Sequence, residues 1–392
     1  MSNRRACREM PFKKTLANLK RSILAMVVFA LLLLAACSSL SGRSESNSQP
    51  VRFSNLYEIE ADTGQRVAPT YFLRRARIQI FRNLARTEVP PTMHLDLASL
   101  EQRKFAVSWL GHSSILMRVD GLWVLIDPVL TNTAGPVAGL GPARLTPLPI
   151  AMRDLPPIDL VLISHDHYDH LDLPTVRHLA RQAGGPPQFM VGQGLADWFR
   201  SRVGVEAQEF DWWEQTQVGN IRLHFVPAHH NSGRRLRNPN TTLWGGWAVE
   251  YNGQRFLYTG DTAYVQALFQ DIRAYLGPID LAAIPVGVYL PRKAMRFEHV
   301  NPEEAVLAHL DLGAKRSFGV HWGTFQLGDD EPFQPAADLA EALGKQDAQG
   351  FGLLPIGALL DVTEAHGAAD SALRHPGELR PGRAGRKPLA SF

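Results

Sequence analysis

The sequence predicts an α/β protein in which β-sheets are sandwiched between layers of helices. Strand-like apolar runs recur from Phe105 onward, and segments with a helical pattern separate many of them. The chain has 392 residues, of which 45% are hydrophobic and 20% are charged. This is enough to bury a sizeable core, as one large domain or two ordinary ones.

The first half of the predicted domain is rich in strands. Strands are expected at residues 105–110, 114–119, 122–127 and 158–164, the last of them buried on both faces. Between the last two lies a Gly- and Pro-rich loop at 131–157, and loops of that length usually mark function or mobility. A helix is expected at 173–183, with Pro174 in its first turn and Gly184-Gly185 at its end.

The second half continues the alternation. Further strands are expected at 221–226, 247–251, 255–259, 281–285, 315–320 and 351–357, and further helices at 263–275, 302–310 and 334–344. We therefore assign one domain to residues 105–365, with residues 51–104 as a leading segment packed on it. Residues 366–392 are rich in Gly, Pro and Arg and have little to bury, which predicts a disordered tail.

The N-terminus resembles a bacterial lipoprotein signal peptide at residues 1–37. A basic region precedes the 15 apolar residues Ser22–Ala36, and Leu34-Ala-Ala-Cys37 resembles a lipobox, in which Cys37 becomes lipidated and N-terminal after cleavage. The apolar stretch is shorter than the about 20 residues of a transmembrane helix. The alternative is an uncleaved anchor helix that ends in Ala-Ala-Cys by chance. Translation could also start at Met10 instead of Met1.

A processed lipoprotein would be attached to the cell envelope. Residue Ser38 follows the lipobox, in place of an Asp that would favour the inner membrane, so an outer-membrane anchor in a Gram-negative bacterium is expected. The Ser-rich residues 38–50 then form a tether. The chain has only Cys7 and Cys37, so the mature protein has no disulfide and no thiolate metal ligand.

The charge distribution argues against a nucleic-acid-binding protein. The net charge is +3, but seven Lys/Arg and a single acid lie within residues 1–36, and the tail is basic as well. The middle of the chain is therefore acidic, opposite to the basic surface that nucleic-acid binding requires.

The most informative stretch is S-H-D-H-Y-D-H, residues 164–170, which follows the buried strand at 158–164. Strand ends are where a rigid scaffold presents functional groups. Imidazole and carboxylate are ligands for Zn, Mn or Fe, and the H-x-H-x-D-H spacing allows His165 and His167 to face one metal and Asp169 and His170 a second. The alternative is a solvated polar loop. In an extended segment, Asp166 is expected to face outward.

Three later strand ends offer further ligands. They supply His229 or His230 after the strand at 221–226, Asp261 in Gly-Asp-Thr after the strand at 255–259, and His321 after the strand at 315–320. Each residue alone is a weak signal, but their shared position after a strand strengthens the set.

These motifs resemble the metallo-β-lactamase fold superfamily and, within it, the N-acyl-phosphatidylethanolamine-hydrolysing phospholipase D family. The resemblance covers roughly residues 105–330 and rests on W-L-G-H-S-S from 109, L-I-D-P-V from 125, T-L-W-G-G-W from 242, G-D-T-A-Y from 260, I-P-V-G from 284, H-V-N-P-E-E-A from 299 and H-W-G-T-F from 321. It implies an αββα sandwich with the site at one edge of the paired sheets.

The resemblance also implies residue roles. The first metal would be held by His165, His167 and His230, the second by Asp169, His170 and His321, with Asp261 bridging both. Of the two adjacent histidines, His230 matches the family position. His299 matches a histidine near the substrate, so the catalytic set would comprise Asp169, Asp261 and His299, while His112 and Asp127 support the site. Arg234 and Arg235, in the basic stretch 231–237, could clamp a phosphate; the alternative is a solvated loop.

The implied activity is phospholipase D-type hydrolysis of N-acyl-phosphatidylethanolamine to phosphatidic acid and N-acylethanolamine. Two Zn²⁺ ions, or Mn or Fe, would lower the pKa of a shared water and give a metal-bridging hydroxide near neutral pH. Two alternatives remain open: a hydrolase of another ester, lactone or phosphodiester on the same fold, and a non-catalytic envelope lipoprotein that uses the domain for binding.

Overall fold

The computed structural model describes residues 52–59, 88–137, 141–234, 239–362 and 372–383. The predicted signal peptide with Cys37, the tether at 38–50 and most of the leading segment lie outside the described residues. Within the described part of the chain, no helix is both long and apolar enough to cross a bilayer.

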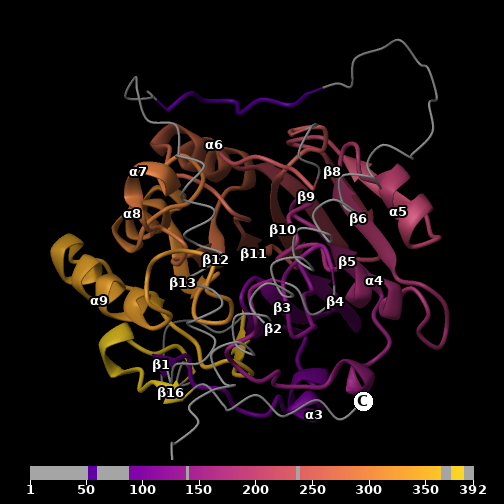
Figure 1. The fold of residues 1–392 in the computed structure, drawn as a ribbon, viewed down its shortest axis with the longest axis horizontal. Coiled ribbons are helices and arrows are strands. Elements are labelled where there is room, and N and C mark those ends of the chain that lie inside the picture. Colours follow the sequence, from indigo (N-terminus) through magenta and orange to yellow (C-terminus); the bar gives the residue numbers. More distant parts are fainter. Residues whose placement is uncertain (1–51, 60–87, 138–140, 235–238, 363–371, 384–392) are drawn as a thin grey trace, which may run out of the picture. The chain divides into compact units, whose positions relative to one another are not determined.

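Two seven-stranded mixed sheets form the centre of the domain (Figure 1). The first has the order β15-β2-β3-β4-β5-β6-β7, with bounds Leu359–Asp361, Phe105–Gly111, Ser114–Val119, Leu122–Ile126, Leu160–Leu162, Gln188–Gly192 and Ala207–Phe210. The second has the order β14-β13-β12-β11-β10-β9-β8, with bounds Phe351–Gly352, Ala314–Val320, Ile279–Pro285, Gln254–Tyr258, Gly245–Tyr251, Ile221–Pro227 and Gln215–Val218.

Helices cover the outer face of each sheet. The first sheet is covered by α3 (Leu97–Glu101), α4 (Leu173–Leu179) and α5 (Ala196–Arg202), and the second by α6 (Gln266–Leu276), α8 (Pro302–Leu312) and α9 (Gln334–Gln346). The short helix α7 (Arg292–Met295) precedes α8, and the 3-10 helices η1 and η2 span Met152–Asp154 and Pro376–Glu378. The predicted αββα sandwich is confirmed.

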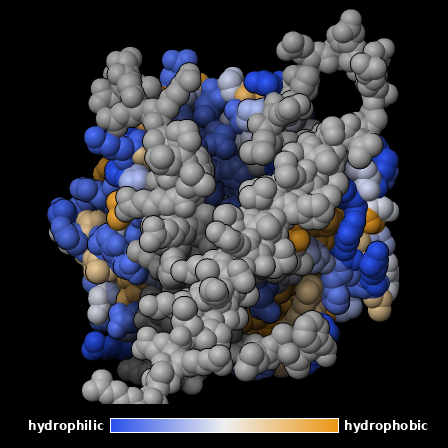
Figure 2. Space-filling model, in the orientation of Figure 1, coloured by the Kyte–Doolittle hydropathy of each residue, from blue (hydrophilic) through white to orange (hydrophobic). Residues whose placement is uncertain are grey.

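The alternation of side chains along each strand divides the core. In β2, Phe105, Val107 and Trp109 belong to a buried cluster that contains residues of both sheets, whereas Ala106 and Leu110 join the cluster beneath α3, α4 and α5. Both faces of this strand are therefore buried. On the face shown in Figure 2, the visible described residues are mostly hydrophilic, with smaller hydrophobic areas between them.

Local sequence signals explain several element boundaries. Helix α8 begins with a capping box between Asn301 and Glu304 and ends at Gly313 in the left-handed conformation. Helix α4 begins at Leu173 as expected, with Asp172 as its N-cap, but it ends at Leu179, earlier than the predicted residue 183. The sequence analysis does not predict β6, α5, β7 and β8; β7 and β8 are short and polar, so their apolar signal is weak.

The prediction of a disordered tail is wrong for the part of it that the structure describes, residues 372–383. Arg374 forms a backbone bridge with Leu353, η2 lies against α9, and β16 (Gly382–Arg383) pairs with β1 (Glu88–Val89). A segment can form backbone hydrogen bonds with other segments without an apolar sequence. The composition of residues 366–392 therefore did not reveal that part of the tail is ordered.

Candidate metal centre

The predicted ligands gather where strands of both sheets end. β5 leads into the motif at 164–170 and β2 into His112 from the first sheet, while β9, β11 and β13 lead into His230, Asp261 and His321 from the second. Because the two sheets face each other, residues far apart in the sequence meet at one edge of the sandwich.

Hydrogen bonds to Asp127, which follows β4, fix the start of the motif. Its Oδ1 accepts the Ser164 backbone N–H (2.8 Å), and its Oδ2 accepts the Ser164 hydroxyl (2.5 Å). The Ser164 carbonyl in turn accepts the N–H of Gly245 (3.0 Å). Gly260, just before Asp261, has φ +66°, and a Cβ there would lie 2.3 Å from the Gly245 carbonyl oxygen, so only glycine fits.

The first ligand set consists of His165, His167 and His230. The Nδ1 atom of His167 lies 2.9 Å from His165 Nε2 and 3.3 Å from His230 Nε2. His230, and not His229, takes part in this set. The imidazole of His229 belongs to neither ligand set, and the His229 backbone N–H donates to the Thr262 hydroxyl.

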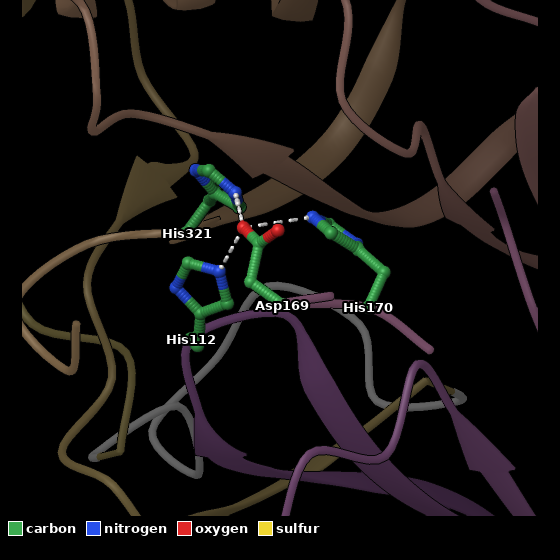
Figure 3. Close-up of side chains that lie close together, drawn as sticks. All are labelled: His112, Asp169, His170 and His321. Atoms are coloured by element: carbon green, nitrogen blue, oxygen red, sulfur yellow. Dashed lines mark hydrogen bonds and ion pairs between the residues drawn. The ribbon is translucent and has the colours of Figure 1, made fainter. Parts of the chain in front are cut away.

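The second set surrounds Asp169 (Figure 3). Its Oδ2 lies 3.3 Å from His321 Nε2, 3.5 Å from His170 Nε2 and 2.9 Å from His112 Nε2. His112 was expected only to support the site, yet its ring nitrogen lies closer to Asp169 than those of the two expected ligands.

Asp261 connects the two sets. Its Oδ2 lies 3.1 Å from His170 Nε2 and 3.0 Å from His321 Nε2 in the second set, and 3.9 Å from His230 Nε2 in the first. A carboxylate in this position can reach ions in both sets, as a bridging ligand must.

Three of the histidines have their outer ring nitrogen held by an acceptor. His165 Nδ1 faces the Ser164 hydroxyl oxygen (2.9 Å), His170 Nδ1 faces Asp127 Oδ2 (2.7 Å), and His230 Nδ1 faces the Glu298 carbonyl (2.9 Å). An N–H at Nδ1 leaves the Nε2 lone pair free to bind a metal, the arrangement common in metalloproteins.

The charges of the centre depend strongly on one another. Burial alone would raise the pKa values of Asp169 and Asp261, but the neighbouring histidines, His170 first, hold both pKa values well below the usual range. Burial alone would lower the pKa of His321, but Asp261 and Asp169 raise that pKa to about 9. Burial lowers the pKa of His112 to about 3 and that of His299 to about 4.

The residues fit a pair of metal ions. Tetrahedral ligands at a zinc–nitrogen distance of about 2.0–2.1 Å are separated by about 3.3 Å, close to the spacing of the first set. In addition, hydrogen-bond partners among the described residues are missing for the buried atoms Asp261 Oδ1, His299 Nδ1 and His321 Nδ1. Buried carboxylates and imidazoles of this kind are usually paired or bind metal. The buried His/Asp clusters are therefore consistent with a binuclear site.

His299 lies outside the two ligand sets, but it forms a further close cluster with Asp261 and His321. Its Nδ1 is 3.8 Å from Asp261 Oδ2, and its ring is 5.2 Å from that of His230 and 5.4 Å from that of His321, measured between centroids. The residue is 7% exposed.

The basic loop has a different geometry. Arg234 stacks on Tyr168 at 4.1 Å and donates from Nη1 to the carbonyls of Asp166 (2.8 Å) and Leu171 (2.6 Å), so it fastens the motif loop. It also lines a groove of about 830 Å³ beside α4 and α5. Whether it binds phosphate stays a prediction, and Arg235 lies outside the described residues. The expectation that Asp166 faces outward is wrong: its Oδ1 accepts the Gly233 N–H (2.8 Å), and it is 6% exposed.

Several supporting residues were not predicted. Ser164 and Tyr258 both donate to Asp127 Oδ2, and the Glu298 carbonyl holds His230. Ser164 is the first residue of the recognised motif, and Tyr258 lies two residues before Gly260, so their positions could have suggested them. A backbone carbonyl, in contrast, cannot be recognised from residue type.

Comparisons with known proteins agree with this geometry. The Beta-lactamase superfamily domain family matches residues 122–322. The chain is 37% identical to N-acyl-phosphatidylethanolamine-hydrolyzing phospholipase D 1 of Caenorhabditis elegans over 61% of this chain and 70% of that protein. It is 43% identical to an uncharacterized protein of Mycobacterium tuberculosis over 61% of this chain and 64% of that one.

A further sequence relative and a solved structure were also matched. The mitochondrial N-acyl-phosphatidylethanolamine-hydrolyzing phospholipase D of Saccharomyces cerevisiae is 34% identical over 61% of this chain and 53% of that protein. The solved structure of a possible metal-dependent hydrolase from Veillonella parvula has a TM-score of 0.54 at 14% identity, over 66% of this chain and all of that one. At that identity, the structural likeness supports the fold alone.

Proposed function

This chain belongs to the metallo-β-lactamase superfamily of metal-dependent hydrolases, and we propose that it hydrolyses N-acyl-phosphatidylethanolamine to phosphatidic acid and an N-acylethanolamine. The observation that carries the proposal is the buried double set of His and Asp ligands joined by Asp261. The choice of substrate is supported by the named activities of the nematode and yeast relatives.

Each part of the centre has a role in the proposed reaction. His165, His167 and His230 would hold one ion, Asp169, His170 and His321 would hold the other, and Asp261 lies within reach of both sets. The ions would lower the pKa of water and neutralise negative charge on the attacked phosphodiester. Water adds its oxygen to phosphorus, the bond from phosphorus to the ethanolamine oxygen breaks, and a proton is transferred to that leaving oxygen.

His299 is placed to orient the substrate. Its low pKa keeps the imidazole neutral at pH 7, so Nδ1 can donate or accept a hydrogen bond without a charge. We assign it to the phosphate oxygens or the leaving group, since no described residue occupies that nitrogen.

We propose two Zn²⁺ ions per chain. Nitrogen-rich sets of three histidines suit zinc, while His/Asp sets also accept Mn or Fe, and selectivity in cells follows metal supply. Elemental analysis of protein purified without chelator tests this choice.

The test of function joins metal content to product. The full-length protein is analysed for metals and incubated with N-acyl-phosphatidylethanolamine in mixed micelles, beside Asp261→Asn. The matched control is Asp280→Asn, a buried carboxylate whose partners are Arg255 and Lys315. We expect about two metals, with phosphatidic acid and N-acylethanolamine released by the wild type and the control only. Two metals without lipid product would favour another ester, lactone or phosphodiester, and absence of metal would favour a binding protein.

We also propose that a lipid on Cys37 attaches the enzyme to the outer membrane, close to a phospholipid substrate. Cys37→Ala should leave the precursor uncleaved and unlabelled by radioactive fatty acid. Normal labelling of this variant would refute the lipobox assignment.

A further inference from the structure

A short N-terminal segment, residues 52–59, lies beside the loop that carries His230. The backbone N–H of Phe53 donates to the Asn240 carbonyl (2.8 Å), and the Tyr57 hydroxyl donates to Asp271 on α6. The rings of Phe53 and Tyr57 pack against the core cluster shared by the two sheets. The segment is thus fastened at both ends, with Asn55 between the two attachments.

Asn55 pairs with both backbone polar groups of His230. Its Nδ2 donates to the His230 carbonyl (3.0 Å), and its Oδ1 accepts the His230 N–H (3.0 Å). The indole N–H of Trp244 donates to the same Oδ1 (3.0 Å). Because both partners of Oδ1 are donors and the partner of Nδ2 is an acceptor, the amide can adopt only one of its two orientations.

His230 depends on this pairing. The residue is 2% exposed, and among the described residues no other group forms a hydrogen bond with its backbone N–H or carbonyl. Its ring is held separately, through Nδ1, by the Glu298 carbonyl. Two attachments therefore place Nε2 at 3.3 Å from His167 Nδ1: Asn55 fixes the backbone, and Glu298 fixes the ring.

We propose that Asn55 is a positioning residue for the first metal ion, acting through the backbone of His230. Its loss would allow the loop to shift while the other two ligands, His165 and His167, stay on the separate motif loop. This inference rests on the proposed metal centre and is independent of which ester the enzyme cleaves.

A simpler explanation is that Asn55 only fastens the segment to the domain. In that case, removing another attachment of the same segment should have the same effect. Tyr57→Phe does this: it deletes the hydrogen bond to Asp271 but does not touch any residue of the metal centre. Tyr57→Phe is therefore the matched control.

The experiment measures the affinities of the two ions separately. Full-length wild type, Asn55→Ala, Asn55→Asp and Tyr57→Phe are loaded with zinc and titrated with a competing chelator. The visible spectrum of the cobalt-loaded proteins is recorded in parallel. We expect Asn55→Ala to weaken the affinity for one ion by about 10- to 100-fold, which is the usual effect of losing a partner that orients a ligand. The affinity for the other ion should stay within about twofold of the wild-type value. Its cobalt spectrum should change, and Tyr57→Phe should match the wild type in both measurements.

Asn55→Asp keeps the shape and the Oδ1 acceptor but places a second acceptor oxygen against the His230 carbonyl in place of the donor, so it should also weaken the binding of the same ion. It also tests the inference if Asn55→Ala does not fold. Two results would overturn the inference. One is wild-type metal affinity in both Asn55 variants. The other is an equal loss of affinity for both ions that Tyr57→Phe also shows. A wild type that binds two ions but releases no lipid product would refute the proposed substrate alone, and a wild type without metal would refute both.

Discussion

Asp127 offers the sharpest test of how the centre is held together, through the substitution Asp127→Asn. Its Oδ2 accepts three hydrogen bonds, from the Ser164 hydroxyl, His170 Nδ1 (2.7 Å) and the Tyr258 hydroxyl (2.8 Å), whereas its Oδ1 accepts one from the described part of the chain, the Ser164 N–H. Asparagine has a single oxygen. The amide will therefore keep its oxygen at the Oδ2 position and turn its NH₂ toward the Ser164 N–H.

Two costs follow from this geometry. The fully buried Ser164 N–H loses its acceptor, which lowers the free energy of unfolding by about 1–3 kcal/mol. In addition, His170 now donates to a neutral oxygen, so it becomes a weaker metal ligand. Loss of such a partner lowers metal affinity by about 10- to 100-fold, which corresponds to about 1.4–2.8 kcal/mol.

The assay combines denaturant unfolding of the metal-free protein with chelator competition on the loaded protein. The control is Ser317→Ala, which removes a buried hydrogen bond to His309 Nδ1 (2.8 Å) in a part of the core that does not contact the centre. We expect it to lower stability by about 1–3 kcal/mol and to leave metal affinity unchanged. Wild-type metal affinity in Asp127→Asn, or an equal loss in Ser317→Ala, would refute this account of Asp127.

Further predictions concern the ions and their ligands. Asp261→Asn should lose at least one ion and lower kcat/KM by more than about 100-fold, since it removes a ligand and not only its support; elemental analysis and kinetics check this. His299→Ala should keep both metals and lose activity, and loss of one metal equivalent would instead make His299 a ligand. At pH 7 the metal-free His321, with its pKa raised to about 9, carries a proton that metal binding must displace, so calorimetry in buffers of different ionisation enthalpy should show proton release that disappears above pH 9. Removing the metals should lower the melting temperature, because each ion present at 100 times its Kd adds about 2.7 kcal/mol.

The sequence predicted the parts of the site that follow buried strands. The motif after β5 was recognisable because several ligand-type residues follow one apolar run, and Asp261 and His321 because each follows a strand in the same way. Strand ends at one edge of facing sheets lie close together, so a residue's position directly after a strand was enough to predict that it belongs to the site. The fold class followed from the same strands.

The support around the ligands was not predictable in this way. Asn55 and His230 are separated by 175 residues, and the pairing uses backbone atoms that every residue possesses. The Glu298 carbonyl that orients His230 is equally invisible in the sequence. Nor does the spacing of the basic loop reveal that Arg234 turns toward the carbonyls of Asp166 and Leu171. These contacts depend on how loops pack, which local patterns do not specify.

The backbone at three strand ends shows what the centre requires. His112, Asp127 and His321 each follow the last residue of a strand, β2, β4 and β13, and each has a positive φ, of 53°, 41° and 63°. The left-handed conformation costs a residue other than glycine about 1–2 kcal/mol. The His321 N–H donates to the His112 carbonyl (2.9 Å), so two of these residues join the sheets directly behind the second ligand set. Glycine would relieve the backbone at each position but would remove an imidazole or carboxylate from the centre. We infer that side-chain chemistry, and not backbone preference, determines these residues, and that the buried hydrogen bonds around them offset the strain.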